Sequence, residues 1–445
     1  MAAVEDTRRN LDLDTALAEA ERRYLDANPE SVVRHEAAKA SMPGGNTRSI
    51  LHYAPCPLTV TRGRGCRIQS LDGAEYIDFL GEYSAGLYGH SNPAIVAAMT
   101  AALDDGVVLG APNLHEARFA AELCARFPSL ERVRFCNSGS EADLMALSLA
   151  RAVTKRGKVL AFEEAYHGGF LIFGHGGSPL NVPFPMVMGR YNDIAATQAQ
   201  IAAHGKDLAA VILEPMLGAG GCIPATPGFL EMLRRETARH GILLVFDEVI
   251  TSRLSPGGLQ AALGVIPDLT TLGKYLGGGS SFGAFGGRAE IMDRFDPARH
   301  DRLFHAGTFN NDVLTMAAGY AGLTEVLSPA ALEALNVRGD TLRAALQATF
   351  EGAGQGRALA MTASGLGSIL CIHFRPGPIT RPSDLEGEDP RLKQLFHLAM
   401  LERGIYLSPR GMMALSLPMG DAETDALLGA IAGFIEDHHP LLPKA

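Results

Sequence analysis

The sequence predicts an α/β protein with a mainly parallel central sheet and a smaller α+β domain. Two observations lead to this fold class. Short, almost wholly apolar runs such as KVLAF, LAAVIL and GILLVF alternate with helical segments through the middle of the chain. Such runs are typical of strands that are buried on both faces of a parallel sheet. The C-terminal part instead mixes the short runs SILCIHF and MALSLP with helices, which favours a separate α+β unit.

The same pattern divides the chain into three parts. Residues 1–75 hold two helical segments and then a short antiparallel meander, and we expect them to contribute to the small domain. Residues 76–330 hold the alternating strands and helices of the expected large domain. After a long amphipathic helical segment, residues 331–445 form the expected C-terminal small domain. The stretch RPGPITRPSDLEGEDPR, which contains Arg381, is the best candidate for a long mobile loop.

Composition and charge favour a soluble cytoplasmic enzyme. The 445 residues allow a large core, and a formal net charge of −10 argues against nucleic acid or an anionic membrane as the main partner. The polar start MAAVEDTRRN lacks the apolar stretch of a signal peptide. The six cysteines form no CxxC pair, so we expect buried thiols and no metal or disulfide framework.

Lys274 is the most informative residue of the chain. It lies between the run DLTTLG and a glycine-rich turn. A desolvated lysine amine can be neutral and can act as a nucleophile and proton carrier, although a lone lysine in such a place is more often an exposed surface residue.

The presence of Asp247 favours the reactive interpretation of Lys274 over that of an exposed surface residue. It ends the run LLVF, where an ionised carboxylate needs a cationic partner. The alternative is a structural Asp that caps the next helix. Its neighbour Glu248 could support Asp247 or simply face solvent.

The segment NSGSEA predicts an anion site. A strand, a turn of small residues and a helix would place the backbone N–H groups of Ser138, Gly139 and Ser140 at the positive end of the helix. Ser138 could equally be a plain N-cap residue. Tyr166 in AYHGG is a candidate for stacking on a cofactor ring, and Thr308 in GTF offers a further phosphate hydroxyl.

These features together match one cofactor. An amine, a buried carboxylate and a phosphate site are the three contacts that pyridoxal 5′-phosphate (PLP) requires. Asn137, Tyr166, Glu214 and Asp247 all fall at or just past the ends of predicted strands, where ligands of such sheets bind, so Glu214 is a further cofactor-binding candidate. The sequence contains no GxxxxGK[ST], HExxH or complete GxGxxG motif, so nucleotide and zinc-hydrolase chemistry is disfavoured.

The motifs NSGSEA, AYHGG, EPM, FDEV, LGKYLGGG and GTF resemble those of class III aminotransferases, which are PLP enzymes of fold type I. The resemblance covers about residues 35 to 440, with the motifs in the family's order. It implies that Lys274 is the Schiff-base lysine and that Asp247 pairs with the pyridine nitrogen. It also implies that Ser138, Gly139 and Ser140 surround the phosphate and that Tyr166 stacks on the ring. Thr308 would reach the phosphate of the neighbouring subunit, which implies a homodimer.

Within the class, PGGNTRSILHYAP, NSGSEADLMAL, FDEVITSRL, SFGAFGG and YLSPRG resemble β-amino-acid aminotransferases that act on 3-amino-3-phenylpropanoate. This resemblance implies that Arg48 binds the carboxylate of the β-amino acid and that Arg410 binds the α-carboxylate of a keto acid. A guanidinium fork matches a carboxylate with two hydrogen bonds. For each arginine the alternative is a solvated loop charge.

We therefore expect an enzyme that moves an amino group from a β-amino acid to an α-keto acid such as 2-oxoglutarate or pyruvate. The main alternative is a glutamate-1-semialdehyde 2,1-aminomutase, whose MPGG stretch and glycine-rich lysine loop are similar, and which needs no separate keto acid. A phosphate-ligand binder without activity is the other alternative. The presence of Lys274 together with Asp247 disfavours it.

Overall fold

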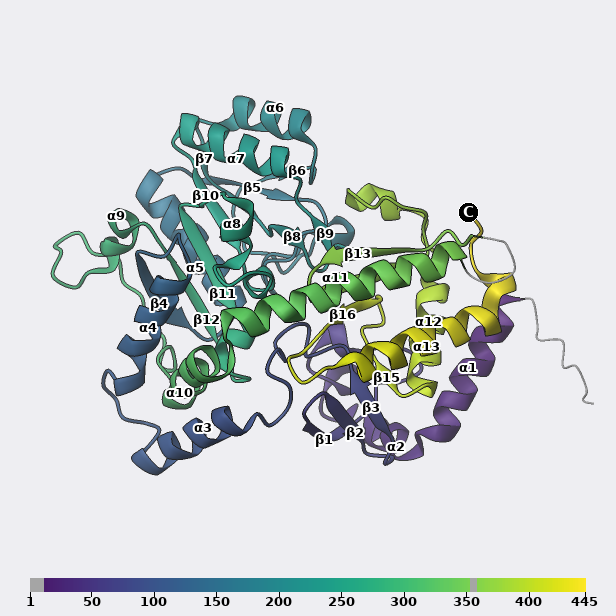
Figure 1. Ribbon diagram of the computed structural model, residues 1–445. Coiled ribbons are helices and arrows are strands. Elements are labelled where there is room, and N and C mark those ends of the chain that lie inside the picture. The colour runs from purple at the N-terminus through teal and green to yellow at the C-terminus, as the bar shows by residue number, and fades with distance from the viewer. Residues whose placement is uncertain (1–11, 353–357) are drawn as a thin grey trace, which may run out of the picture.

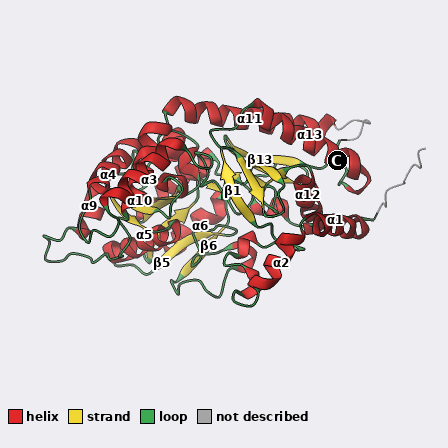
Figure 2. Cartoon of the chain, turned by 90° about the horizontal axis from the view of Figure 1, so that it is seen from below, coloured by secondary structure: helices red, strands yellow, loops and turns green. Residues whose placement is uncertain are grey.

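The computed structural model describes residues 12–352 and 358–445, so the first eleven residues of the expected N-terminal segment 1–75 lie outside the described part. Figure 1 shows two regions that are connected by the long helix α11 (Pro329–Gly352). In the view of Figure 2 the strands lie in the interior, with helices around them.

A seven-stranded sheet forms the centre of the larger region, with the order β4-β12-β11-β10-β7-β5-β6. Its strands are β4 (Arg132–Cys136), β5 (Lys158–Phe162), β6 (Met186–Gly189), β7 (Leu208–Leu213), β10 (Leu243–Asp247), β11 (Leu269–Gly273) and β12 (Gly283–Gly287). Only β12 runs antiparallel to its neighbours. Every residue of β7, β10 and β11 is buried, as their apolar sequences require. The predicted fold class is confirmed.

Helices pack on this sheet and extend the larger region at its edge. They are α3 (Pro93–Asp105), α4 (Leu114–Arg126), α5 (Gly139–Thr154), α6 (Ile194–His204), α7 (Pro227–His240), α8 (Gly258–Leu263), α9 (Ala289–Met292) and α10 (Val313–Ala321). Helix α5 shows why such segments fold. Ser138 caps its N-terminus, and Ala142, Ala146 and Leu149 are buried on its sheet-facing side.

The smaller region combines both ends of the described chain. Its four-stranded sheet has the order β1-β2-β3-β15, built from β1 (Val60–Arg64), β2 (Arg67–Ser70), β3 (Glu75–Asp78) and β15 (Ile405–Tyr406). The first three strands form the expected antiparallel meander, and β15 pairs in parallel with β3. The N-terminal segment and the C-terminal part thus share one sheet, while the predicted domain boundaries stay a prediction.

A second sheet and four helices complete the smaller region. The sheet is formed by β13 (Thr362–Leu366), β14 (Ile369–His373) and β16 (Met412–Ala414), and the helices are α1 (Leu13–Ala27), α2 (Pro29–Ala38), α12 (Pro390–Glu402) and α13 (Asp421–His438). A short hairpin of β8 (Met216–Leu217) and β9 (Ile223–Pro224) faces this region.

The six cysteines are free, and all except Cys124 are buried. None of the helices described is long and apolar enough to span a membrane.

Candidate active site

The strand ends converge at one edge of the central sheet. Because β4, β5, β7, β10 and β11 run in the same direction, their carboxyl ends meet there. Lys274 follows β11 directly and adopts a left-handed backbone conformation, with φ 55°. Its Nζ donates a hydrogen bond to the carbonyl oxygen of Tyr83 at 2.6 Å. Burial lowers the pKa of Lys274 to about 8, although the charges of Asp247 and Glu214 oppose the shift. A neutral amine is therefore accessible near neutral pH.

Asp247 ends β10 and is only 4% exposed. Its Oδ2 is 2.8 Å from Nδ1 of His167, and its Oδ1 accepts a hydrogen bond from the backbone N–H of Val249 at 3.0 Å. The alternative that it caps the next helix is not needed to explain its burial, since it has these partners. Glu248 does not face solvent. It is fully buried and accepts hydrogen bonds from the backbone N–H groups of Leu259 and Gln260.

Two buried residues beside Asp247 were missed by the sequence reasoning. His167 is the neighbour of Tyr166 in AYHGG, and Asp143 lies on α5, where Thr271 Oγ1 donates to its Oδ1 at 2.5 Å. The available signal was a single carboxylate on the otherwise apolar face of the predicted helix.

The NSGSEA segment forms the predicted turn between a strand and a helix. Ser138 and Ser140 make different hydrogen bonds there. Ser138 is the N-cap of α5, since its Oγ accepts a hydrogen bond from the N–H of Glu141 at 3.2 Å. Ser140 Oγ accepts one from the N–H of Gly169 at 3.1 Å. A Cβ on Gly139 would lie 2.9 Å from the side chain of Val249, so only glycine fits there. The N–H groups of the first helical turn point outwards and can bind an anion.

Tyr166 and Glu214 lie next to each other at this edge. The Tyr166 side chain remains 45% exposed, and its backbone N–H donates to Glu214 Oε1 at 3.1 Å. The other Glu214 oxygen accepts from the N–H of Gly218 at 2.9 Å. Burial, and then the charge of Asp247, raise the pKa of Glu214 to about 7. Glu214 thus fastens two loops at the strand ends.

Arg48 and Arg410 come from opposite ends of the chain and approach the same turn. Arg48 forms an ion pair with Glu82, and both side chains are about half exposed. The Arg410 guanidinium lies over the ring of Tyr83, 5.9 Å from its centroid, and Nη1 donates to the carbonyl oxygen of Ala219 at 3.5 Å.

That turn has an unusual backbone. Gly81, Glu82, Tyr83 and Ser84 are all left-handed, with φ of 51°, 49°, 53° and 81°. Each non-glycine residue in this conformation costs about 1 kcal/mol or more, so the surrounding structure must impose it. The fully buried Arg253 contributes, since its Nη1 donates to the carbonyl oxygen of Ser84 at 3.1 Å. The strained turn 81–84 therefore connects Lys274 with both arginines.

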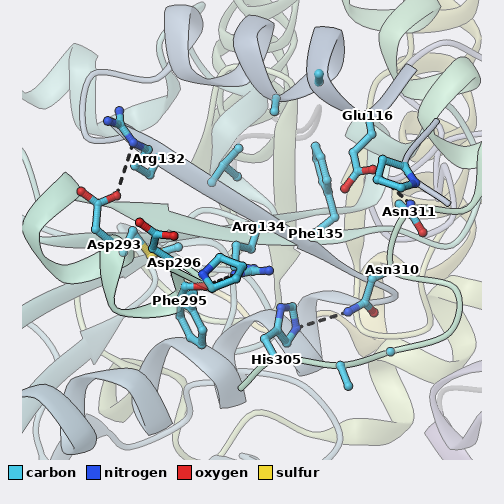
Figure 3. Close-up of a pocket in the computed structure, with 18 of the residues that line it drawn as sticks. Glu116, Arg132, Arg134, Phe135, Asp293, Phe295, Asp296, His305, Asn310 and Asn311 are labelled. Carbon is cyan, nitrogen blue, oxygen red and sulfur yellow. Dashed lines mark hydrogen bonds and ion pairs between the residues drawn. The ribbon is translucent and has the colours of Figure 1, made fainter. Parts of the chain in front are cut away.

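Two cavities flank these residues. One, of about 770 Å³, is lined by Arg410, His373 and the glycine-rich loop that follows β8. The second, of about 660 Å³, lies beside β4 and α4, and Figure 3 shows its side chains. Asn310 at its rim is hydrogen bonded to Asn137 at 3.1 Å. Thr308, in the adjoining segment, is exposed.

The strand-end residues fit PLP chemically. They supply an amine, a buried carboxylate, a helix N-terminus for a phosphate and an aromatic side chain beside them, all at one sheet edge.

Known proteins share both the sequence and this fold. The family model for "Aminotransferase class-III" matches residues 51–173 and 179–433. The beta-phenylalanine transaminase of Variovorax paradoxus is 51% identical over 97% of this chain and 99% of that protein. The crystal structure of a beta-phenylalanine aminotransferase from the same organism has a TM-score of 0.95, covering 98% of this chain and 100% of that one.

More distant relatives agree on the family. The glutamate-1-semialdehyde 2,1-aminomutase of Sorangium cellulosum is 38% identical, over 90% of this chain and 94% of that protein. A solved transaminase with PLP bound is 30% identical, with a TM-score of 0.85, and covers 92% of this chain and 98% of that chain. The protein whose strand ends gather Lys274, Asp247 and the α5 N-terminus is an enzyme of the class III aminotransferase family.

Proposed function

We propose that this aminotransferase uses PLP to move an amino group from a β-amino acid of the 3-amino-3-phenylpropanoate type to an α-keto acid such as 2-oxoglutarate or pyruvate. One observation carries the proposal. Lys274 and two arginines meet at a single strained turn beside the strand-end carboxylates. The likeness to a beta-phenylalanine transaminase supports the choice of amino donor.

The residues around Lys274 would hold the cofactor. Lys274 would bind its aldehyde, Asp247 its ring nitrogen, and the N-terminus of α5, from Ser138 to Ser140, its phosphate. Tyr166 would stack on the ring, and Glu214 would keep the loop of Tyr166 in place. When bound, PLP supplies the electron sink for the substrate carbon.

Lys274 would also move the proton. With a pKa of about 8, its amine can be neutral and take a proton from the substrate carbon. The carbonyl oxygen of Tyr83 accepts a hydrogen bond from Nζ at 2.6 Å, which gives the displaced amine a fixed resting position. A short path from Nζ in a fixed direction favours return of the proton to one face of the substrate carbon.

Arg48 and Arg410 would bind the carboxylates of the two substrates. An aminotransferase holds two acids in turn, and each arginine offers a planar pair of donors. Arg48 would take the β-amino acid and Arg410 the keto acid. Because Glu82 already pairs with Arg48, an incoming carboxylate has to displace Glu82.

A homodimer in the cytoplasm is part of the same proposal. Val108, Leu114, Phe304 and Phe309 are at least 60% exposed, which is unusual for a group of large apolar side chains. Their two segments are neighbours, since Asn113 Nδ2 donates to the carbonyl oxygen of Asn311 at 2.7 Å. A second copy would cover this face and would bring Thr308 to the phosphate of its partner.

Light scattering on purified protein tests the dimer. Phe304→Asp should convert a dimer into a monomer, whereas Val337→Asp on α11, 66% exposed in the wild type, should leave the mass unchanged. A wild-type monomer at micromolar concentration would refute this part.

A half-reaction tests the activity. The PLP-loaded protein is mixed with 3-amino-3-phenylpropanoate without a keto acid, and the cofactor absorbance is followed. Loss of the starting absorbance, restored by 2-oxoglutarate, is expected.

The second candidate is a glutamate-1-semialdehyde 2,1-aminomutase, which the likeness to such enzymes favours. No response to the β-amino acid, with conversion of glutamate-1-semialdehyde in the absence of any acceptor, would establish it instead.

A further inference from the structure

Three ionisable side chains are packed together at the carboxyl edge of the central sheet. Asp143 on α5, His167 after β5 and Asp247 at the end of β10 are 1%, 1% and 4% exposed. One oxygen or nitrogen atom from each lies within 4.8 Å of the others. The roles proposed above for Lys274, Tyr166 and the N-terminus of α5 do not involve Asp143.

The carboxylates of Asp143 and Asp247 are close neighbours, with an oxygen of one within 4.8 Å of an oxygen of the other. Asp247 accepts from His167 Nδ1 and from the N–H of Val249, while Asp143 accepts from Thr271 Oγ1. Ionised carboxylates are acceptors only, so a hydrogen bond between two of them requires a proton on one.

His167 is paired with Asp247 rather than with Asp143. His167 Nδ1 donates to Asp247, and its buried Nε2 has no hydrogen-bond partner among the described residues. The other charged groups that act on the cluster are Glu214 and Lys274.

The electrostatics agree with the geometry. Burial, followed by the charge of Asp247, raises the pKa of the Asp143 carboxyl well above its usual range. The Thr271 hydrogen bond opposes this shift and does not cancel it.

We propose that Asp143 is a protonated carboxylic acid that donates its hydrogen bond to Asp247, and that this pair carries a single negative charge towards the ring nitrogen of PLP. Asp143 is thus a positioning residue that acts through Asp247. The inference rests on the proposed role of Asp247.

The arrangement moderates the attraction between Asp247 and the ring nitrogen. A hydrogen bond donated to a carboxylate draws on its negative charge, so Asp143 would weaken the pull of Asp247 on the ring proton. One negative charge then matches one protonated ring nitrogen, and no excess charge is buried.

Infrared spectroscopy tests the proton directly. Spectra of the wild type at pH 7, as apoprotein and loaded with PLP, are compared with those of D143N. Because Glu214, with a pKa of about 7, contributes to both proteins, the difference spectrum isolates Asp143 and should contain the carbonyl band of a protonated carboxylic acid that shifts in D₂O. The side-chain amide N–H of D143N can still donate to Asp247, so the fold should be kept, which a thermal melt checks.

Nitrogen NMR of bound PLP, labelled with ¹⁵N in the ring, tests the consequence. D143N should have the same midpoint for ring-nitrogen deprotonation as the wild type. D143L removes the donor, so Asp247 should hold the ring proton more firmly and raise the midpoint by on the order of one pH unit.

Several results would overturn the inference. These are absence of the carbonyl band from the difference spectrum of the wild type and D143N, and a D143N midpoint displaced as far as that of D143L. A tightly bound divalent cation found by elemental analysis and lost in D143N would also do so, because the cation would neutralise both carboxylates. Failure of the proposed function is distinguishable: protein that shows the band and ignores the β-amino acid would refute the donor assignment alone.

Discussion

The two sides of the candidate site are built in different ways. On the cofactor side, Asp247, Asp143 and His167 are buried, and they lie on or just after regular elements of the larger region. On the substrate side, Arg48 and Glu82 are half exposed and lie in loops, and the turn beside them is strained. The proposed cofactor side is thus preorganised. On the proposed substrate side, a substrate carboxylate has to replace Glu82 as the partner of Arg48.

The largest effect should come from the cofactor side. Lys274→Ala should lower turnover by at least about 10³-fold, because both a nucleophile and a proton carrier are lost. Stopped-flow absorbance with the amino donor measures this, and the absorbance of bound PLP reports whether the cofactor is still held. Turnover near that of the wild type would remove Lys274 from the centre of the reaction.

The substrate side should respond more selectively. Arg410→Ala should raise the KM for the keto acid by about 10- to 100-fold, since a charge-assisted hydrogen bond to a buried acid is lost. Rates of the two half-reactions, measured separately, check this. Arg48→Ala is the matched control and should instead raise the KM for the β-amino acid. Equal effects of both variants on both half-reactions would mean that the carboxylates share one site.

A pH series sharpens the comparison, because only the cofactor side contains an amine with a lowered pKa. Burial lowers the pKa of Lys274 to about 8, so about half of the amine is neutral at pH 8, about nine tenths at pH 9, and progressively less below pH 8. The rate at which apoprotein captures PLP should follow this fraction, and its fall should approach tenfold per pH unit below about pH 7. Rapid mixing of apoprotein with PLP between pH 6 and 9 measures the profile. A rate that is flat down to pH 6 would contradict the assignment.

The smallest effect should come from the ion pair between Arg48 and Glu82. Glu82→Gln removes the competitor for Arg48 and should lower the KM for the β-amino acid by about two- to fivefold, as expected for an exposed pair. The KM for the keto acid should not change if Arg410 binds it. Initial rates with each substrate varied in turn decide this, and a higher KM for the β-amino acid would show that Glu82 positions Arg48 rather than competing with it.

The gathering of residues at the strand ends could be predicted from the sequence better than the contacts of the turn 81–84, for a physical reason. Asp247 and the NSGSEA turn follow apolar runs, and parallel strands bring their ends together wherever the sequence shows such runs. The antiparallel strand β12 was not anticipated, because GAFGG has small side chains and no strand-like alternation.

Contacts between distant segments could not be predicted in this way. Nothing in GEYS shows that four successive residues would be left-handed, since the conformation is held by Arg253, far away in the sequence. The pairing of Asp247 with His167 and its closeness to Asp143 likewise depend on how three elements pack. Arg48 and Arg410 were predicted from a family resemblance, and their approach to Tyr83 required the fold.

The pairing of β15 with β3 has a consequence for the order in which parts of the protein can fold during synthesis. The backbone N–H of Phe79 donates to the carbonyl oxygen of Tyr406 at 2.8 Å, and that of Ala414 donates to the carbonyl oxygen of Phe79 at 2.7 Å. The strands of the central sheet, residues 132–287, leave the ribosome before these late partners are synthesised. The turn that follows Phe79 gains its supports from residues 404–417 only near the end of translation. The nascent chain can thus fold the proposed cofactor side first, and the proposed substrate side is the last part of the site that it completes.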